Sequence, residues 1–131
     1  MSGENQTARL EHVNLTVSDP RATAAMLEAV FGWRVRWEGA SIGGGFTMHV
    51  GGAGDYVALY TPPEPPAAGG NSYATVAALN HIGVVVDDLD AVEARVVAQG
   101  FTPVNHGDYE PGRRFYFRDA DAVEWEVVSY G

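Results

Sequence analysis

An internal repeat limits the folds open to this chain more than any other feature of its sequence. The segment LNHIGVVVDD at residues 79–88 repeats the segment LEHVNLTVSD at residues 10–19, with an offset of 69 residues. His12 in the first copy matches His81 in the second, and Asp19 matches Asp88. A self-match at this period predicts two similar modules of about 60 residues. Each module would open with a strand that carries a histidine near its start.

The length of 131 residues and the hydrophobic fraction of 46% predict a folded domain rather than a disordered chain. The segment TPPEPPAAGG at residues 61–70 cannot form regular structure, because proline removes a hydrogen-bond donor and glycine adds conformational freedom. We therefore expect a single domain over residues 1–131. Its first module spans about residues 9–61, its linker about 62–78 and its second module about 79–130.

The charge and the cysteine content restrict the partners and the metal chemistry. A net charge of −9 would repel a nucleic-acid backbone or an anionic membrane, so neither is an expected partner. No apolar run approaches the roughly 18 residues of a transmembrane helix. Residues 1–10 lack the apolar core of a signal peptide and are expected to form a short flexible tail. The absence of cysteine fits a cytoplasmic protein and leaves histidine, carboxylate and water as ligands for any metal.

Hydrophobic periodicity predicts the same order of elements in both modules. Residues 10–17 alternate polar and apolar side chains, as a strand with one polar face does, and His12 lies on that face. Asp19 and Asp88 are expected to cap helices that end at Gly32 and Gly100. Three further strands are expected in each module, at residues 33–37, 46–50 and 56–60 and at residues 101–105, 113–118 and 123–129. The inward stripe of the first helix is expected at Ala22, Ala25, Met26, Ala29 and Val30.

These features resemble the vicinal oxygen chelate superfamily. The resemblance is carried by the paired βαβββ modules, each opening L-x-H-[VI], and by the closing segment FYFRDADAVEWEVV at residues 115–128. That superfamily includes glyoxalase I, extradiol dioxygenases, methylmalonyl-CoA epimerase and the bleomycin- and fosfomycin-resistance proteins. The resemblance implies an α+β fold in which two βαβββ modules form a curled, cup-shaped sheet, with a helix on the outer face of each module.

The resemblance also implies a metal site. The family's ligands come from the first and last strands of the modules, which correspond here to His12, His81 and Glu126. Two imidazoles and a carboxylate suit a divalent metal ion such as Fe, Zn, Mn or Ni, and leave positions for water or substrate. Tyr116 matches the tyrosine of the dioxygenase motif that bonds substrate, and it is the catalytic candidate. The alternative is that Tyr116 packs as part of the wall.

The fourth ligand position of the family is occupied by alanine. After the helices the module offset becomes 68 residues, which places Ala58 opposite Glu126. Glyoxalase I has a carboxylate or a glutamine there, so Ala58 counts against a glyoxalase with its full ligand set. The remaining pattern resembles the facial triad of extradiol dioxygenases and the similar three-ligand set of fosfomycin-resistance transferases.

Several other polar residues are weaker candidates. Glu124 shares a strand face with Glu126, and two carboxylates in a cup would repel each other unless a cation or proton lay between them. We expect Glu124 near the rim, in solvent. His49 and His106 could serve acid–base chemistry or could be ordinary exposed histidines. Arg113 and Arg114 follow an expected loop at residues 106–112, where they could hold an anionic substrate, but a solvated charge pair is the favoured interpretation.

Two function classes remain open. The first is a small-molecule metalloenzyme of the lyase, isomerase or ring-cleaving dioxygenase type. The second is a metal-free small-molecule binding protein of the bleomycin-resistance type, with a cup lined by aromatic residues. The retained His/His/Glu set favours the enzyme. A homodimer is expected because exposed module edges favour pairing, and the cup could form within one chain or by exchange of modules between two chains.

Overall fold

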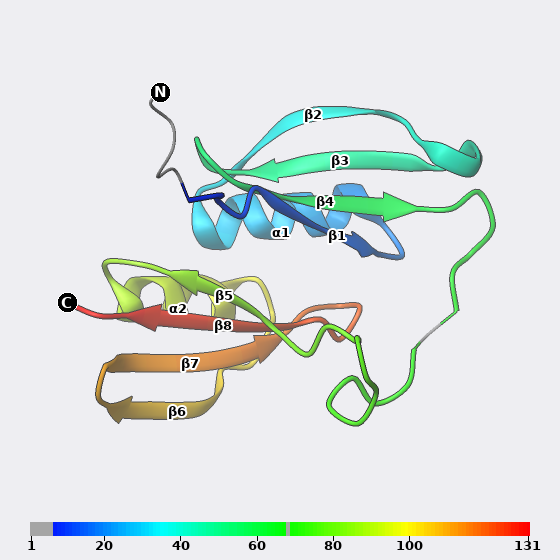
Figure 1. Cartoon of the computed structure of the whole chain (residues 1–131). Coiled ribbons are helices and arrows are strands. Elements are labelled where there is room, and N and C mark those ends of the chain that lie inside the picture. Colours follow the sequence, from blue (N-terminus) through cyan, green and yellow to red (C-terminus); the bar gives the residue numbers. More distant parts are fainter. Residues whose placement is uncertain (1–6, 68) are drawn as a thin grey trace.

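The computed structural model describes residues 7–67 and 69–131, so most of the expected N-terminal tail lies outside the described residues. Two modules with the same order of elements form the fold (Figure 1). The first contains β1 (His12–Thr16), α1 (Pro20–Phe31), β2 (Arg34–Ala40), a short 3₁₀ helix (Ile42–Gly44), β3 (Phe46–Gly51) and β4 (Tyr56–Thr61). The second contains β5 (Ile82–Val85), α2 (Leu89–Ala98), β6 (Val104–Tyr109), β7 (Gly112–Arg118) and β8 (Glu124–Ser129).

Local sequence signals start both helices where they are expected. The Asp19 carboxylate accepts a hydrogen bond from the Ala22 N–H at 3.2 Å, and the Asp88 carboxylate accepts one from Ala91 at 3.0 Å. Each aspartate therefore satisfies a backbone donor that has no partner within its helix. Gly32 ends α1 in the left-handed conformation, with φ of +72°, which a residue with a side chain rarely adopts.

Each module forms one four-stranded sheet, in the order β1-β4-β3-β2 or β5-β8-β7-β6. The first strand of each module pairs in parallel with the last strand, and the remaining pairs are antiparallel. Asn14 pairs with Ala58 in the first sheet, and Gly83 pairs with Glu126 in the second. Since Asn14 and Gly83 are equivalent in the repeat, Ala58 is the structural counterpart of Glu126. The α+β class and the two βαβββ modules forming a curled sheet are thereby confirmed.

Both helices lie behind the sheets as drawn, and edge strands β1 and β5 face each other across the middle of the molecule (Figure 1). One hydrophobic core extends through both modules. Leu27 of α1 and Trp125 of β8 are both fully buried in this core. Phe31 joins the two halves directly, because its ring lies 5.8 Å from the Trp125 ring and 6.3 Å from the Phe117 ring. This shared core sets the position of one sheet relative to the other.

Two expectations about local structure are wrong. The strand expected at residues 101–105 runs instead over Val104–Tyr109, so most of the expected loop at 106–112 is strand. A bulge follows Val104, and Asn105 adopts a positive φ of 53°, which interrupts the alternation that a strand normally shows. In α1 the predicted inward residues Ala22, Ala25 and Ala29 are exposed. The buried residues of that helix are Pro20, Thr23, Ala24, Met26, Leu27 and Val30.

Candidate metal centre

Polar side chains gather on the side of the second sheet that faces away from the core. Successive strand residues point to opposite faces, so the apolar residues Phe115, Phe117 and Trp125 turn inward and their polar neighbours turn outward. His81 joins this group from the position just before β5. We call this surface the polar face of module 2; its members are His81, Arg114, Tyr116, Arg118, Glu124 and Glu126.

The structure brings together two of the three predicted ligands. The Nε2 atom of His81 lies 3.1 Å from Oε1 of Glu126, and the two side chains are 32% and 14% exposed. Neighbouring donors bound at about 2.1 Å to an octahedral cation are about 3.0 Å apart. Arg114 donates to the other carboxylate oxygen, Oε2, at 2.9 Å. The pair therefore fits adjacent positions on one divalent cation, with Glu126 offering a single oxygen.

Glu124 does not lie in solvent at the rim, which corrects the expectation from the sequence. Its side chain is 12% exposed, and its Oε1 accepts a hydrogen bond from Arg118 at 3.1 Å. Its Oε2 accepts a hydrogen bond from the Tyr73 hydroxyl and lies 4.0 Å from Nδ1 of His81. The repulsion between Glu124 and Glu126 is offset because each carboxylate has its own arginine.

Tyr116 lies beside the two predicted ligands. It pairs directly with Glu126 across the β7–β8 ladder, and its ring meets the His81 ring edge-on with centroids 5.7 Å apart. Burial raises the pKa of the Tyr116 phenol, and the charge of Glu126 raises it further. The phenol therefore keeps its proton at neutral pH and can donate a hydrogen bond.

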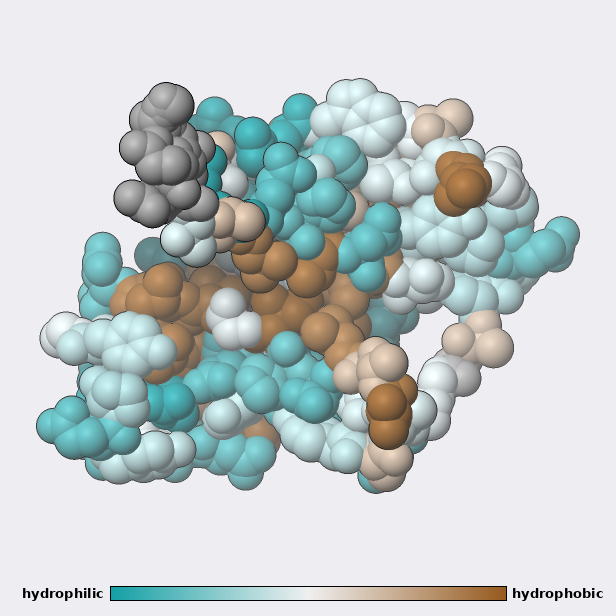
Figure 2. Space-filling view, in the orientation of Figure 1, coloured by the Kyte–Doolittle hydropathy of each residue, from teal (hydrophilic) through white to brown (hydrophobic). Residues whose placement is uncertain are grey.

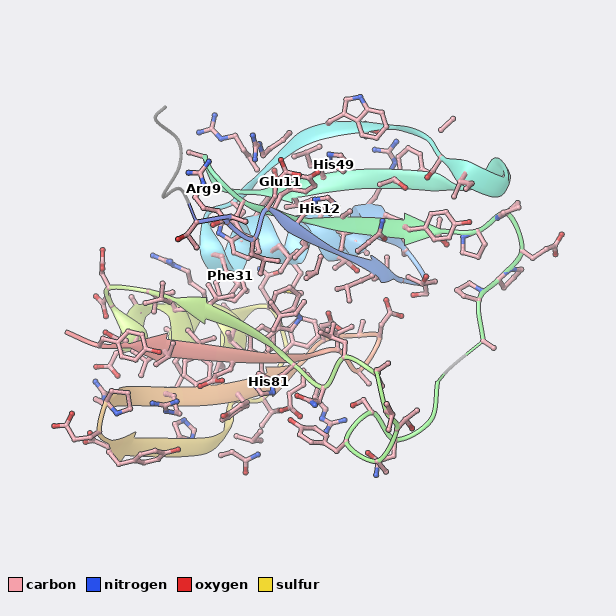
Figure 3. All side chains as sticks on the ribbon, in the orientation of Figure 1. Arg9, Glu11, His12, Phe31, His49 and His81 are labelled. Carbon is pink, nitrogen blue, oxygen red and sulfur yellow. The ribbon has the colours of Figure 1, made fainter. Side chains whose placement is uncertain are left out.

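His12, the third predicted ligand, belongs to the other module. Figure 3 shows His12 and His81 in opposite halves of the molecule. The His12 side chain is 42% exposed and its Nδ1 lies 2.9 Å from Oε1 of Glu11. Within the described residues, no three side chains of the ligand types come close enough together to hold a metal ion. Both histidines line a cleft of about 510 Å³ between the modules, but the predicted triad is not assembled within one chain.

The corresponding face of module 1 is aromatic. The rings of His12 and Tyr56 stack with centroids 4.8 Å apart, Tyr56 stacks on His49 at 4.3 Å, and His49 meets Trp37 at 5.0 Å. We call these four rings the aromatic row. A bulge in β2 between Val35 and Trp37 accompanies the placement of Trp37 beside His49. Burial lowers the pKa of His49 and the charges of His12 and Arg36 lower it further, so this imidazole is neutral at neutral pH.

The structure places the remaining candidates, His106, Arg113 and Arg114, in different surroundings. His106 lies on the helix side, where its Nε2 is 2.8 Å from a carboxylate oxygen of Glu93 in α2, so it takes no part in the polar face. Arg113 pairs with Asp90 and is half exposed, as the solvated interpretation requires. Arg114 is not solvated: it is 14% exposed, and its Nε and Nη2 are buried without a hydrogen-bond partner among the described residues.

Asp119 of the closing segment has a structural role that the sequence reasoning missed. Its Oδ1 accepts hydrogen bonds from the backbone N–H groups of Asp121 and Val123, both at 3.0 Å. Its Oδ2 accepts one from the indole N–H of Trp125 at 3.1 Å. The carboxylate thus holds the turn that leads into β8, the strand that carries Glu124 and Glu126.

The match to a known family rests on nearly the whole chain. Residues 9–127 match the family model of the glyoxalase/bleomycin resistance protein/dioxygenase superfamily. The chain belongs to this superfamily. No curated protein matches the sequence. Among the described residues, no helix is long and apolar enough to cross a membrane.

Several solved structures share the fold at low sequence identity. A glyoxylase/bleomycin resistance protein/dioxygenase domain from Frankia sp. EAN1pec is 20% identical with a TM-score of 0.80, covering 96% of this chain and 94% of its own. TioX from Micromonospora sp. ML1 is 24% identical with a TM-score of 0.68, covering 95% and 100%. The fosfomycin resistance protein FosX from Listeria monocytogenes, complexed with Mn(II) and sulfate, is 20% identical with a TM-score of 0.69, covering 95% and 93%. At these identities the likeness establishes the fold.

Proposed function

We propose that this protein is a metal-dependent enzyme that acts on a small molecule, with His81 and Glu126 as metal ligands. The observation that carries the proposal is the 3.1 Å separation of His81 Nε2 and Glu126 Oε1 on a face that also presents Tyr116. The Mn(II) complex of FosX supports it, because that structural neighbour binds a divalent ion on the same fold. Fe, Zn, Mn and Ni all suit a site of this composition.

The third ligand would be His12 of a second copy of the chain. His12 lies in the other module and is partly exposed. The cleft between the modules is bordered by exposed apolar residues, among them Leu10 at 81% and Val85 at 65% exposure. Figure 2 shows hydrophobic surface extending across the middle of this side of the molecule. A homodimer that covers this surface and exchanges modules would bring His12 of one copy to His81 and Glu126 of the other.

The chain's own residues would divide the work at this site. A bound divalent cation supplies Lewis acidity toward adjacent oxygens of a substrate. Arg114 occupies one oxygen of Glu126 and leaves the other for the cation. Tyr116, which keeps its proton at neutral pH, would donate a hydrogen bond to a substrate oxygen. Within the lyase, isomerase or ring-cleaving dioxygenase types of enzyme, Ala58 offers no fourth ligand, so we favour an oxygenase or transferase-like site over glyoxalase I chemistry.

The metal content of protein purified without chelator tests this proposal. We expect the parent to carry close to one metal ion per chain and the His81→Ala variant to lose it. His106→Ala is the matched control, because it removes a histidine on the helix side and should leave the metal content unchanged. A parent that carries no metal and takes up none of Fe(II), Zn(II), Mn(II) or Ni(II) on titration would exclude the metalloenzyme.

A metal-free binding protein is the second candidate, and the aromatic row favours it. Trp37 is 49% exposed at one end of the row, and the Arg36 guanidinium lies 5.6 Å above the Tyr56 ring. Such a surface can stack a flat ligand. This candidate predicts that aromatic ligands quench tryptophan fluorescence equally well in the presence of a chelator and in a Glu126→Ala variant. The metalloenzyme predicts that both treatments weaken binding.

A further inference from the structure

The linker between the modules contributes a side chain to the polar face of module 2. Tyr73 lies between β4 and β5, and its hydroxyl donates a hydrogen bond to Oε2 of Glu124. The Tyr73 hydroxyl oxygen also lies 3.4 Å from Nδ1 of His81. A local turn holds this part of the linker, because the Asn71 side chain accepts from the Tyr73 N–H at 3.0 Å and the Asn71 carbonyl accepts from Thr75 at 2.9 Å.

These contacts distinguish the two nitrogens of His81. Because the Tyr73 hydroxyl donates its proton to Glu124, the phenol oxygen is left to accept from Nδ1 of His81. A neutral imidazole with its proton on Nδ1 has its lone pair on Nε2. Nε2 is the atom that lies 3.1 Å from Oε1 of Glu126, so the contact from Tyr73 leaves the nitrogen beside Glu126 available to a cation.

Glu124 is itself held in place. Arg118 donates to its Oε1 at 3.1 Å, while its Oε2 accepts from Tyr73. A chain of contacts therefore runs from Arg118 through Glu124 and Tyr73 to the imidazole of His81. Partners of this kind, placed behind a metal-binding histidine, fix the orientation of the ring, and their loss typically weakens metal binding 10- to 100-fold.

We propose that Tyr73 and Glu124 are positioning residues that orient His81 and thereby set the affinity of the site for a divalent cation. This proposal rests on the proposed function, because it concerns the same metal centre. It assigns a role in the site to a segment that links the two modules. A Tyr73 that only packed the linker would have no influence on metal affinity.

Titration of the protein with Mn(II) tests the proposal, with the dissociation constant measured by electron paramagnetic resonance. We expect Tyr73→Phe, which removes the hydroxyl alone, to raise the Kd about 10-fold, and Glu124→Gln to raise it at least as much. Tyr130→Phe is the matched control, because Tyr130 is 59% exposed and Tyr73 is 56% exposed. The Kd of this control should equal that of the parent. A Kd for Tyr73→Phe within twofold of the parent value would overturn the proposal.

Crystal structures of the metal-free parent and of Tyr73→Phe separate this proposal from the proposed function. We expect the parent to show the Tyr73 hydroxyl between Glu124 and His81, and the variant to show a rotated or disordered His81 ring. An unchanged ring in the variant would overturn the positioning role even if the parent binds metal. If the parent binds no metal, the proposed function fails, and the two crystal structures still decide whether Tyr73 orients His81.

Discussion

Replacing Asp119 with alanine should destabilise the protein strongly, because the turn before β8 depends on one carboxylate. The carboxylate accepts three hydrogen bonds, two from the backbone of the turn and one from the indole of Trp125. Trp125 is fully buried, so water cannot replace the lost partner of its N–H group without disturbing the core. The turn also sets the start of the strand that carries Glu124 and Glu126.

The expected loss of stability in Asp119→Ala follows from the surroundings of each hydrogen-bond donor that loses its partner. A buried donor left without a partner costs about 1–3 kcal/mol, which applies to the indole N–H of Trp125. The backbone N–H groups of Asp121 and Val123 lie in a turn closer to the surface, and each should cost about 0.5–1 kcal/mol. The sum is about 3 kcal/mol, which corresponds to a fall of about 10 °C in Tm for a domain of this size.

Urea and thermal unfolding at a fixed protein concentration would measure this loss, with near-ultraviolet circular dichroism reporting the environment of the tryptophans. Asp55→Ala is the control, because Asp55 is exposed, and its stability should stay within about 0.5 kcal/mol of the parent. A loss below about 1 kcal/mol for Asp119→Ala would refute the reasoning that the carboxylate holds the turn.

The pH dependence of the Asp119 effect has a defined sign. Burial raises the pKa of this carboxyl above its ordinary value of 3.8, despite the three donors that favour the charged form. The folded state therefore holds the proton more tightly than the unfolded state. The resulting contribution to stability is complete below the ordinary pKa and is lost as the pH rises through the raised one. The difference in unfolding free energy between the parent and Asp119→Ala should therefore become smaller as the pH rises from the ordinary pKa through the raised one. A difference that grows as the pH rises would contradict this assignment.

Three further predictions concern the assembly and the site. Sedimentation should show a homodimer, and Leu10→Asp should shift the equilibrium toward monomer, because it places a charge on the exposed apolar border of the cleft. A parent protein that is monomeric at all concentrations would rule out the dimer with exchanged modules. Mixing His12→Ala with His81→Ala subunits should restore one intact metal site per heterodimer, whereas no recovery is expected if each site forms within one chain. Tyr116→Phe should retain full metal content while Glu126→Ala loses it, because the phenol is placed as a donor to substrate; metal loss in Tyr116→Phe would make it a ligand.

Local signals in the sequence predicted the parts of the fold that depend on a few neighbouring residues. The caps at Asp19 and Asp88 were predictable because the donor that each carboxylate satisfies lies three residues away. The buried stripe of α1 was not predictable in the same way, because alanines occur on several sides of that helix and their small side chains do not define a face. The fully buried Leu27 and Val30 determine which side turns inward, and that choice depends on the shared core.

Contacts between distant segments explain what the sequence could not predict about the site. Alternation along β8 placed Glu124 and Glu126 on one face, but not the arginines that offset their charges. The pairing of Arg118 with Glu124 across the β7–β8 hairpin could have been inferred from the register of a short turn. The contact from Tyr73 could not have been inferred from the sequence. The composition of residues 61–70 predicts only irregular chain, and it does not indicate where the residues that follow lie in the fold.

The two modules have diverged in a complementary way, so neither alone carries the His/His/Glu set of the proposed site. Module 1 keeps the repeated histidine, but Tyr56 and Ala58 occupy the positions that correspond to Glu124 and Glu126. Its outward face therefore offers a stacking surface that includes the imidazoles of His12 and His49, while module 2 offers the carboxylates, the arginines and the phenol of Tyr116. In a cup built from one module of each kind, an aromatic wall would oppose a polar wall across the metal. Such a cavity suits a small substrate with a flat apolar part and adjacent oxygens. The adjacent oxygens are the groups that the cation of the proposed enzyme would bind.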